Sequence, residues 1–282
     1  MLQATARPAA EDVDLRLVAA QFRARLVELS HQAGTAHLGG SLSCADIMVA
    51  AYWGVLDVDA GRPEDPARDR LILSKGHAAT SLYVALAMKG FFPEAMLDDY
   101  AEPGSPLAEH PSLGSVPGVE ISSGSLGHGL SIGIGMALGL RLQAHQSRVF
   151  VVMSDGECNE GSVWEAAMFA PIHKLDRLVA IIDFNRWQAT GRSEEVMALQ
   201  PLADKWKAFG WSTYEVDGHD PYALRELLSS VPDGSGKPIA VVAHTVKGKG
   251  VSFIEDDNNW HYRIPTTDEV IAAKRELGIV QP

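Results

Sequence analysis

The sequence contains few cysteines, fewer basic than acidic residues, and no long uninterrupted apolar run. Its 282 residues include only two cysteines, Cys44 and Cys158, which are too few for a disulfide framework and favour a reducing cytoplasm. Lysine and arginine number 24 against 36 aspartates and glutamates, and the net charge of -12 argues against a nucleic-acid surface and against attraction to an anionic membrane. The opening residues, MLQATARPAAEDVDLR, lack the apolar centre of a signal peptide.

The most apolar stretch, residues 126–142, is interrupted by glycines and contains His128. We interpret it as a buried helix in tight contact with another element, not as a membrane span. A hydrophobic content of 46% and a charged content of 21% are ordinary for a globular protein with a buried core. The chain has no repeat, low-complexity segment or clear linker, so we expect residues 1–282 to form a single domain.

Local patterns predict several elements in the first half of the chain. Apolar residues spaced by three or four over residues 12–32 predict an amphipathic helix. Ser43 and Asp46 have the spacing of a capping box and predict the start of a second helix. The other expected elements are a strand at 70–73, a helix at 78–89 ended by Gly90, a functional loop rich in glycine, proline and serine at 103–124, and a final helix at 267–277.

The second half of the chain alternates short apolar runs with helical stretches. The runs are rich in β-branched residues and lie at 148–153, 178–183, 211–216 and 238–243. Alternation of strand and helix is typical of a parallel sheet, and continuous apolar strands indicate that the sheet is covered on both faces. We therefore expect an α/β fold with helices on both faces of a parallel sheet.

Two oxygen-bearing side chains each follow one of these apolar runs. Asp155 comes after the first run and Asn185 after the second. Ligands bind beyond the carboxyl ends of parallel strands, so the two oxygens meet if the strands are near each other. Carboxylate and amide oxygens suit Mg²⁺, which takes its remaining ligands from water and phosphates. Gly156 would let the backbone approach a diphosphate closely. Either residue alone would be read as a turn or cap residue.

The stretch from Ser154 to Asn185 resembles the thiamine-diphosphate motif, in which GDG is followed some thirty residues later by Asn. The first glycine is Ser154 in this chain, and the segment NEGSVWEAAMFA (159–170) is similar to transketolases in particular. Further matches in the same order are GTAHLGGSLS (34–43), LSKGHAATSLY (73–83), EHPS (109–112), GSLGHGLSIGIGMALG (124–139) and TVKGKG (245–250). The resemblance covers nearly the whole chain and implies a thiamine-diphosphate-binding fold.

The resemblance implies thiamine diphosphate as the cofactor, held through Mg²⁺ or another divalent cation such as Ca²⁺ or Mn²⁺. The implied metal ligands are Asp155, Asn185 and the main-chain carbonyl of Trp187. The implied cofactor-binding residues are His77, Gly124, Leu126, Gly156, Glu157, Asn185 and Lys247. The implied catalytic residues are His37, His77, His110, His261 and Glu160, with Glu160 and Glu165 at the contact between the two halves of the site.

The implied chemistry suits these residue types. Thiamine diphosphate carries the difficult step, and the protein orients hydroxyl-bearing substrates and moves protons, for which imidazole is suited near neutral pH. The chain departs from the family pattern at Leu38 (usually Pro), His128 (often Gln), Ser154 and the turn 262–265. Leu38 and that turn bear on which substrate is used, and none of the departures removes an implied metal ligand.

A complete transketolase is more than twice as long as this chain, and its second domain supplies the Glu that promotes ylid formation. The resemblance therefore implies the amino-terminal, diphosphate-binding subunit of a split transketolase, which is active only with a carboxy-terminal subunit in a heterotetramer. The implied reaction transfers a two-carbon ketol unit from a ketose or ketose phosphate to an aldose.

Two other functions remain open at this point. One is a subunit of another thiamine enzyme, such as a split 1-deoxyxylulose-5-phosphate synthase, which KGKG (247–250) resembles, or a dehydrogenase E1 component. The other is a non-catalytic cofactor-binding partner. NEGSVWEA (159–166) and the four matched histidines favour transketolase, and a scaffold has no need of those histidines.

Overall fold

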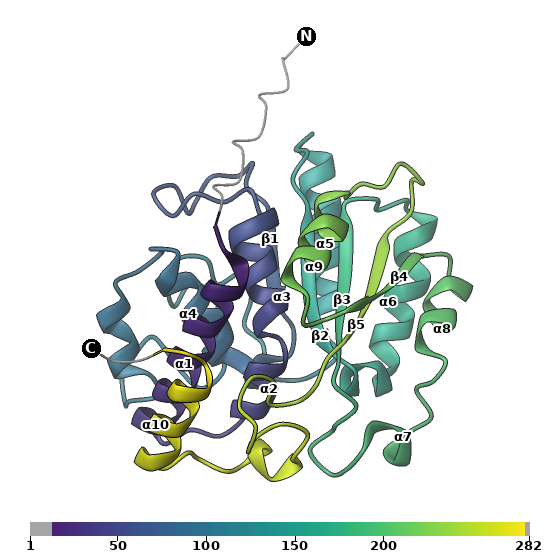
Figure 1. Ribbon diagram of the computed structural model, residues 1–282. Coiled ribbons are helices and arrows are strands. Elements are labelled where there is room, and N and C mark those ends of the chain that lie inside the picture. The colour runs from purple at the N-terminus through teal and green to yellow at the C-terminus, as the bar shows by residue number, and fades with distance from the viewer. Residues whose placement is uncertain (1–12, 280–282) are drawn as a thin grey trace.

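Five parallel strands form one sheet in the computed structural model, which describes residues 13–279 (Figure 1). The strands are β1 (Arg70–Leu73), β2 (Val149–Ser154), β3 (Leu178–Phe184), β4 (Ser212–Asp217) and β5 (Ile239–His244), in the order β1-β2-β3-β5-β4. Every neighbouring pair is parallel. Each strand begins and ends within one residue of its prediction, because β-branched apolar runs mark buried parallel strands.

Helices connect the strands and account for most of the remaining regular structure. They are α1 (Leu15–Ala33), α2 (Leu38–Ser43), α3 (Ala45–Ala50), α4 (Ala79–Met88), α5 (Gly129–Leu142), α6 (Gly161–Ile172), α7 (Ser193–Val196), α8 (Leu202–Ala208), α9 (Pro221–Ser229) and α10 (Thr267–Glu276). The predicted helices at 12–32, 78–89 and 267–277 correspond to α1, α4 and α10, although residue 12 lies outside the described residues. Residues 103–124, all of them described, contain neither helix nor strand, as predicted.

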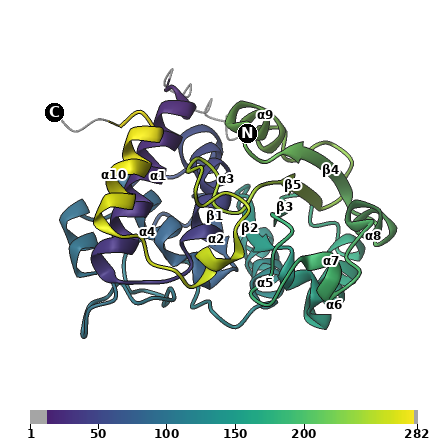
Figure 2. The same ribbon diagram turned by 60° about the horizontal axis from the view of Figure 1, so that its bottom comes forward.

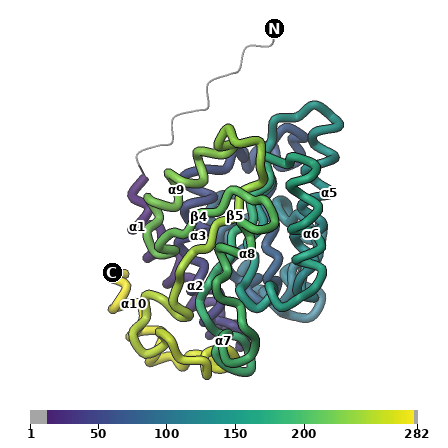
Figure 3. Tube along the Cα trace, turned by 90° about the vertical axis from the view of Figure 1, so that its right-hand side faces the viewer, coloured from purple at the N-terminus to yellow at the C-terminus, as the bar shows by residue number. Residues whose placement is uncertain are grey.

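The strands β1, β2, β3 and β5 are buried on both faces, as the sequence predicts, whereas the edge strand β4 is only partly buried. Within β2, Phe150 and Val152 belong to one hydrophobic cluster, whereas Val149, Val151 and Met153 belong to another, because successive side chains of a strand point to opposite faces. The first cluster includes residues of α1, α3, α4 and α9, and the second includes residues of α5, α6 and α8. Figure 3 shows α5 and α6 on one side of the sheet and α1 and α9 on the other.

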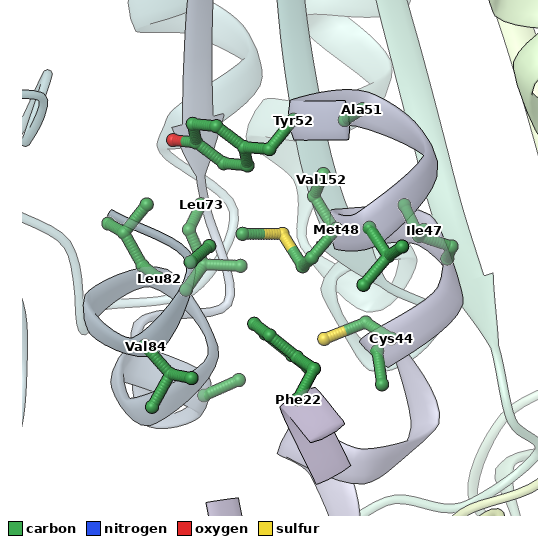
Figure 4. Packing of buried hydrophobic residues seen from close by; sticks show 14 of the residues in the cluster. Phe22, Cys44, Ile47, Met48, Ala51, Tyr52, Leu73, Leu82, Val84 and Val152 are labelled. Carbon is green, nitrogen blue, oxygen red and sulfur yellow. The ribbon is translucent and has the colours of Figure 1, made fainter. Parts of the chain in front are cut away.

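The first cluster is centred on α1, α3 and α4. Phe22 of α1 is fully buried and points toward Met48 of α3, with Leu82 of α4 and Val152 of β2 nearby (Figure 4). Burying a side chain of this size stabilises the fold by roughly 1.5–3 kcal/mol. The helix α2, which lies between α1 and α3 in the sequence, packs against α1, α3 and α4.

The predicted capping box at Ser43 and Asp46 is wrong. Ser43 is the last residue of α2, and α3 begins after Cys44 without a side-chain cap. The Ser43 hydroxyl donates to Asp183 instead, and the Asp46 carboxylate pairs with Arg23. Both side chains have long-range partners, which a local spacing pattern does not reveal.

The prediction for residues 126–142 holds in part. The helix is α5, and a Cβ on Gly133 would lie 2.6 Å from Cγ2 of Val151, so this glycine is in tight contact as expected. Gly135 and Gly139 have no such neighbour within 4 Å, and Leu142 is 88% exposed. One face of α5 is therefore not covered by residues 13–279. Across that part of the chain, no helix is long and apolar enough to cross a membrane.

Replacing two of the glycines in α5 should have opposite effects. We expect Gly133→Ala to lower the free energy of unfolding by up to about 2 kcal/mol, because overpacking against Val151 costs about 1–3 kcal/mol and helix propensity returns about 1 kcal/mol. Gly135→Ala meets nothing and should raise it by roughly 0.5–1 kcal/mol. Urea denaturation of both variants measures the difference, and an equal effect at the two positions would contradict the packing described here.

Candidate functional site

Asp155 and Asn185 meet at the carboxyl edge of the sheet, as the sequence predicts. They follow β2 and β3, which are neighbours with Ser154 opposite Asp183. Asp155 Oδ2 accepts hydrogen bonds from the Arg186 N–H at 2.9 Å and the Ser193 hydroxyl at 2.7 Å, and Oδ1 accepts from Gly156. Asp155 is thereby bonded directly to the loop that carries Asn185. Burial raises the pKa of Asp155 to about 7, so a cation beside it would stabilise the carboxylate.

A cavity of about 400 Å³ opens at this edge. Its lining comes from α2, the loop that follows β3 and the segment between β5 and α10, among others, and Figure 2 brings this end of the sheet forward. Of the residues predicted from the sequence, the cavity brings together His37, His77, His110, His261, Gly124, Leu126, Gly156, Glu160, Asn185, Trp187 and Lys247. Asp155, Glu157 and Glu165 are described residues outside its lining, and Asp155 is buried directly beside it.

Three of the histidines form a cluster within the cavity. The ring of His37 lies 4.8 Å from that of His261 and 5.6 Å from that of His77, measured between centroids, and the last two are 6.0 Å apart. His110 approaches from the 103–124 loop, where a Cβ on Gly124 would lie 3.0 Å from its Cδ2. Four imidazoles from four separate segments therefore surround one space.

The cluster depends on a close approach of two backbone segments. Gly76 precedes His77 after β1, and a Cβ on Gly76 would lie 2.6 Å from the Gly124 nitrogen and from the carbonyl carbon of Ser123. Only glycine fits at this distance, because Cβ contacts under 3 Å are not tolerated against backbone atoms. The SKGH and GSLG motifs are thus packed against each other, which places His77 beside Gly124.

Lys247 holds His261 in a defined tautomer. The Lys247 ammonium donates to Asn258 Oδ1 at 2.7 Å and to His261 Nδ1 at 3.1 Å. Because an ammonium has no acceptor, Nδ1 is unprotonated and the imidazole carries its proton on Nε2. The positive charge of Lys247 also lies at the cavity, where an anionic group would be stabilised.

The imidazoles of the cluster are held neutral. Burial, Lys247 and His37 lower the pKa of His261 to about 4. Burial lowers the pKa of His37, and lowers that of His77 well below its usual value. Burial and the charge of Lys75 lower the pKa of Lys247 to about 8. Near pH 7 each of the three imidazoles has one N–H donor and one nitrogen lone pair. His37 and His77 can therefore donate a hydrogen bond to a sugar hydroxyl or accept one, whereas the lone pair of His261 is already bonded to Lys247.

The two acidic residues that follow Gly156 lie in different surroundings. Glu157 is fully buried, and its carboxylate accepts from the Ser74 hydroxyl, the Gly127 N–H at 3.0 Å and the Ser154 N–H at 2.9 Å. These bonds join the turns that follow β1 and β2, so the geometry favours a supporting role over direct cofactor contact. Glu160 is exposed at the cavity wall.

The loop after Asn185 is braced by Asp256. The Arg192 guanidinium makes two bonds of 2.6 Å to the Asp256 carboxylate, which also accepts from Trp187 Nε1 at 2.7 Å. Arg192 stacks on the Trp187 ring at 3.7 Å. The segment that carries the predicted carbonyl ligand is therefore fixed against the loop between β5 and α10.

Sequence reasoning missed a buried polar network beneath the cavity. Asp183 pairs with Lys75, and both side chains have no exposed surface. Asp183 also accepts from the hydroxyls of Ser43 and Thr245 and from Asn185 Nδ2 at 3.4 Å. The available signal was a charge next to the end of an apolar strand, since a buried charge requires a partner.

Three unpartnered atoms show that the cavity suits a polar ligand. Among residues 13–279, His37 Nδ1, Asn159 Oδ1 and Gln188 Nε2 are buried without a hydrogen-bond partner, and all three residues line the cavity. Buried polar groups are normally satisfied, so each indicates a missing partner. Asn159 and Gln188 were not predicted. In the same part of the chain, no group of three or more His, Cys, Asp and Glu could hold a metal, and the predicted ligand set contains only one such side chain.

The chain matches a known family over almost its entire length. Residues 15–282 match the family described as "Transketolase, thiamine diphosphate binding domain". A curated relative from Phocaeicola vulgatus, named as one subunit of an apulose-4-phosphate transketolase, is 42% identical over 264 residues, which cover 94% of each chain. "6-deoxy-6-sulfo-D-fructose transketolase subunit SqwG" from Clostridium sp. is 39% identical, covering 95% of this chain and 97% of the relative.

Solved transketolases share the fold. The transketolase from Leishmania mexicana superimposes with a TM-score of 0.89 at 25% identity, covering 94% of this chain and 41% of that one. The transketolase from Campylobacter jejuni gives a TM-score of 0.86 at 25% identity and is covered to 43%. The chain thus spans about two fifths of the length of these solved transketolases, and it belongs to the transketolase family as a thiamine-diphosphate-binding domain.

Proposed function

We propose that this chain is the thiamine-diphosphate-binding subunit of a two-subunit transketolase. With its partner it would transfer a two-carbon ketol unit from a ketose or ketose phosphate to an aldose. The observation that carries the proposal is the convergence of four histidines, Lys247 and Asn185 on one cavity beside the buried Asp155. The curated relatives named as transketolase subunits support it, and residues 1–282 are proposed to form a single domain.

The cation and the diphosphate would be held at the carboxyl edge of the sheet. Asp155, Asn185 and the carbonyl of Trp187 would bind Mg²⁺ or a similar divalent cation, while Gly156 and Lys247 would face the diphosphate. Thiamine diphosphate, when bound, supplies a carbanion and then an electron sink. The remaining work for this chain is to orient the sugar and to move protons.

The histidine cluster would perform that work. Because the imidazoles of His37 and His77 are neutral, each can accept a proton from a sugar hydroxyl near pH 7 and then return it. His110, on an exposed loop at the cavity mouth, would contact the substrate from the other side. The fixed tautomer of His261 makes its Nε2–H the donor toward the cavity.

The proposed partner is a carboxy-terminal subunit, giving a heterotetramer. On α6, which also carries the exposed Glu165, the side chains of Met168, Phe169 and Ile172 are 56%, 42% and 78% exposed. Together with Leu142 on α5 they form an apolar face on the side of the sheet covered by these helices. Exposed apolar patches of this kind mark interaction surfaces. Two relatives of similar length are each named as one subunit of a transketolase, which supports a second chain as the occupant.

Neither alternative function has comparable support. Three curated relatives that match along most of their length are named as transketolase subunits, not as synthase or dehydrogenase components. A non-catalytic partner would have no need for the full histidine set. We propose sugars or sugar phosphates as substrates, and a reducing cytoplasm as the compartment, which the two free, buried cysteines favour.

Removing the buried carboxylate should abolish cofactor binding. We expect Asp155→Ala to weaken Mg²⁺-dependent binding of thiamine diphosphate to the assembled enzyme by several kcal/mol, because the cation that neutralises the diphosphate loses its charged ligand. Isothermal titration calorimetry measures the affinity, with Asp204→Ala, an exposed carboxylate on α8, as the control. Unchanged affinity in Asp155→Ala would remove the proposed metal site.

Removing a clustered imidazole should slow turnover. His77→Ala and His261→Ala should each reduce the rate of ketol transfer by about 10²–10⁴-fold, the usual effect of losing a positioned proton-transfer group. His145→Ala is the matched control, because His145 lines a separate cavity with Arg141 and Arg177. Near-normal rates in both cluster variants would show that the imidazoles have only a structural role.

Activity should require a second polypeptide. The chain alone, given thiamine diphosphate, Mg²⁺, a ketose phosphate and an aldose, should show no two-carbon transfer. Adding the cognate carboxy-terminal subunit should restore the transfer and produce a heterotetramer, whose mass is measured by light scattering. Ile172→Asp should prevent this association without changing the stability of the isolated chain, since the side chain is exposed there. Robust turnover by the chain alone would refute the two-subunit proposal.

A further inference from the structure

We propose that Ser43 and Asp183 are positioning residues that fix which way the Asn185 amide faces and so present its oxygen to the divalent cation. The inference deepens the proposed function and rests on it. It assigns a role to the polar network beneath the cavity, which the catalytic proposal leaves unused.

The hydrogen bonds determine the orientation of the amide. Asn185 Nδ2 lies 3.1 Å from Ser43 Oγ and 3.4 Å from Asp183 Oδ2. The Ser43 hydroxyl donates its proton to Asp183, so its oxygen presents only lone pairs to Asn185. Both neighbours are therefore acceptors, and an amide oxygen in the same place would face two other oxygens. The NH₂ group must point down into the network.

The opposite end of the amide completes the arrangement. Asn185 Oδ1 accepts the Trp187 N–H at 3.0 Å and is on the side of the loop that carries the proposed carbonyl ligand. Asn185 lines the cavity although it is only 6% exposed. With the NH₂ group directed into the network, the oxygen remains available to a cation at the cavity.

Asp183 is held as an acceptor by donors on every side. The Lys75 ammonium donates to Oδ2, and the Thr245 hydroxyl donates to Oδ1. Lys75 is itself anchored by a 2.8 Å bond to the Gly40 carbonyl in α2. The network therefore joins α2, β3 and the segments after β1 and β5 behind one amide.

An asparagine ligand needs neighbours that fix the orientation of its amide, whereas an aspartate ligand does not. Either oxygen of the Asp155 carboxylate can bind a cation, so its rotation is harmless. A reversed Asn185 amide would instead direct an N–H donor at the cation, which repels it. Outer partners that orient metal ligands typically change metal affinity by about 10–100-fold when removed.

Ser43 and Thr245 form a matched pair for the test. Each donates one hydroxyl to Asp183, but only Ser43 also contacts Asn185. We expect Ser43→Ala to weaken the Mg²⁺ affinity of the assembled enzyme, at saturating thiamine diphosphate, by about 10-fold or more, and Thr245→Val to retain it. Ser43→Cys replaces the hydroxyl with a somewhat larger thiol, which is a weak acceptor, and it should reproduce the loss if Ser43→Ala does not fold.

The measurement is a calorimetric titration of Mg²⁺, accompanied by the thermal unfolding midpoint of each cation-free variant. A purely structural network would lower the midpoint and the affinity to the same extent in the Ser43 and Thr245 variants, and that result would overturn the inference. Wild-type affinity in the Ser43 variants would also overturn it. Failure of the wild-type enzyme to bind Mg²⁺ with thiamine diphosphate would instead refute the proposed function.

Discussion

The parallel pairing of β2 with β3 is the constraint on which the site depends. Their register places Ser154 opposite Asp183, so the turns that follow both strands leave the sheet side by side. Asp155 bonds to the loop after β3, and Asp183 receives donors from segments that follow β1 and β5. A shift of two residues in this register would separate these side chains by about 6–7 Å and disperse the site.

The carboxyl edge of the sheet also shows how charge is tolerated in the core. Lys75 and Asp183 are fully buried, and such a pair costs free energy unless every remaining polar atom is satisfied. The hydroxyls of Ser43 and Thr245 and the Gly40 carbonyl provide that satisfaction. An apolar pair could stabilise the fold equally well, so the retained charges point to a requirement of the site.

The sequence predicts the sheet and the residues of the cavity better than it predicts the long-range contacts that hold them in place. Strands such as β2 follow from β-branched runs, and the cavity residues follow from the resemblance to transketolases that the short motifs carry. The capping box at Ser43 failed because its hydroxyl bonds to Asp183, 140 positions later. Local spacing carries no information about such contacts. For the same reason the sequence could not distinguish Gly133, which packs against Val151, from Gly135 in the same helix, where a Cβ would contact no other segment.

The chain folds around the site without enclosing it. The buried end of the cavity holds neutral imidazoles and polar atoms without partners, so a ligand there gains hydrogen bonds in surroundings of low dielectric. The other end is bounded by Glu160, which immediately precedes α6, whereas the exposed apolar residues of α6 lie toward the carboxyl-terminal end of that helix. Catalysis by the cofactor requires exclusion of water, because electrostatic interactions strengthen in a dry site. A second chain that extended along the whole of α6, from Glu160 to Ile172, would bury the apolar face and close the cavity in the same association, so assembly and formation of the active site would be one event.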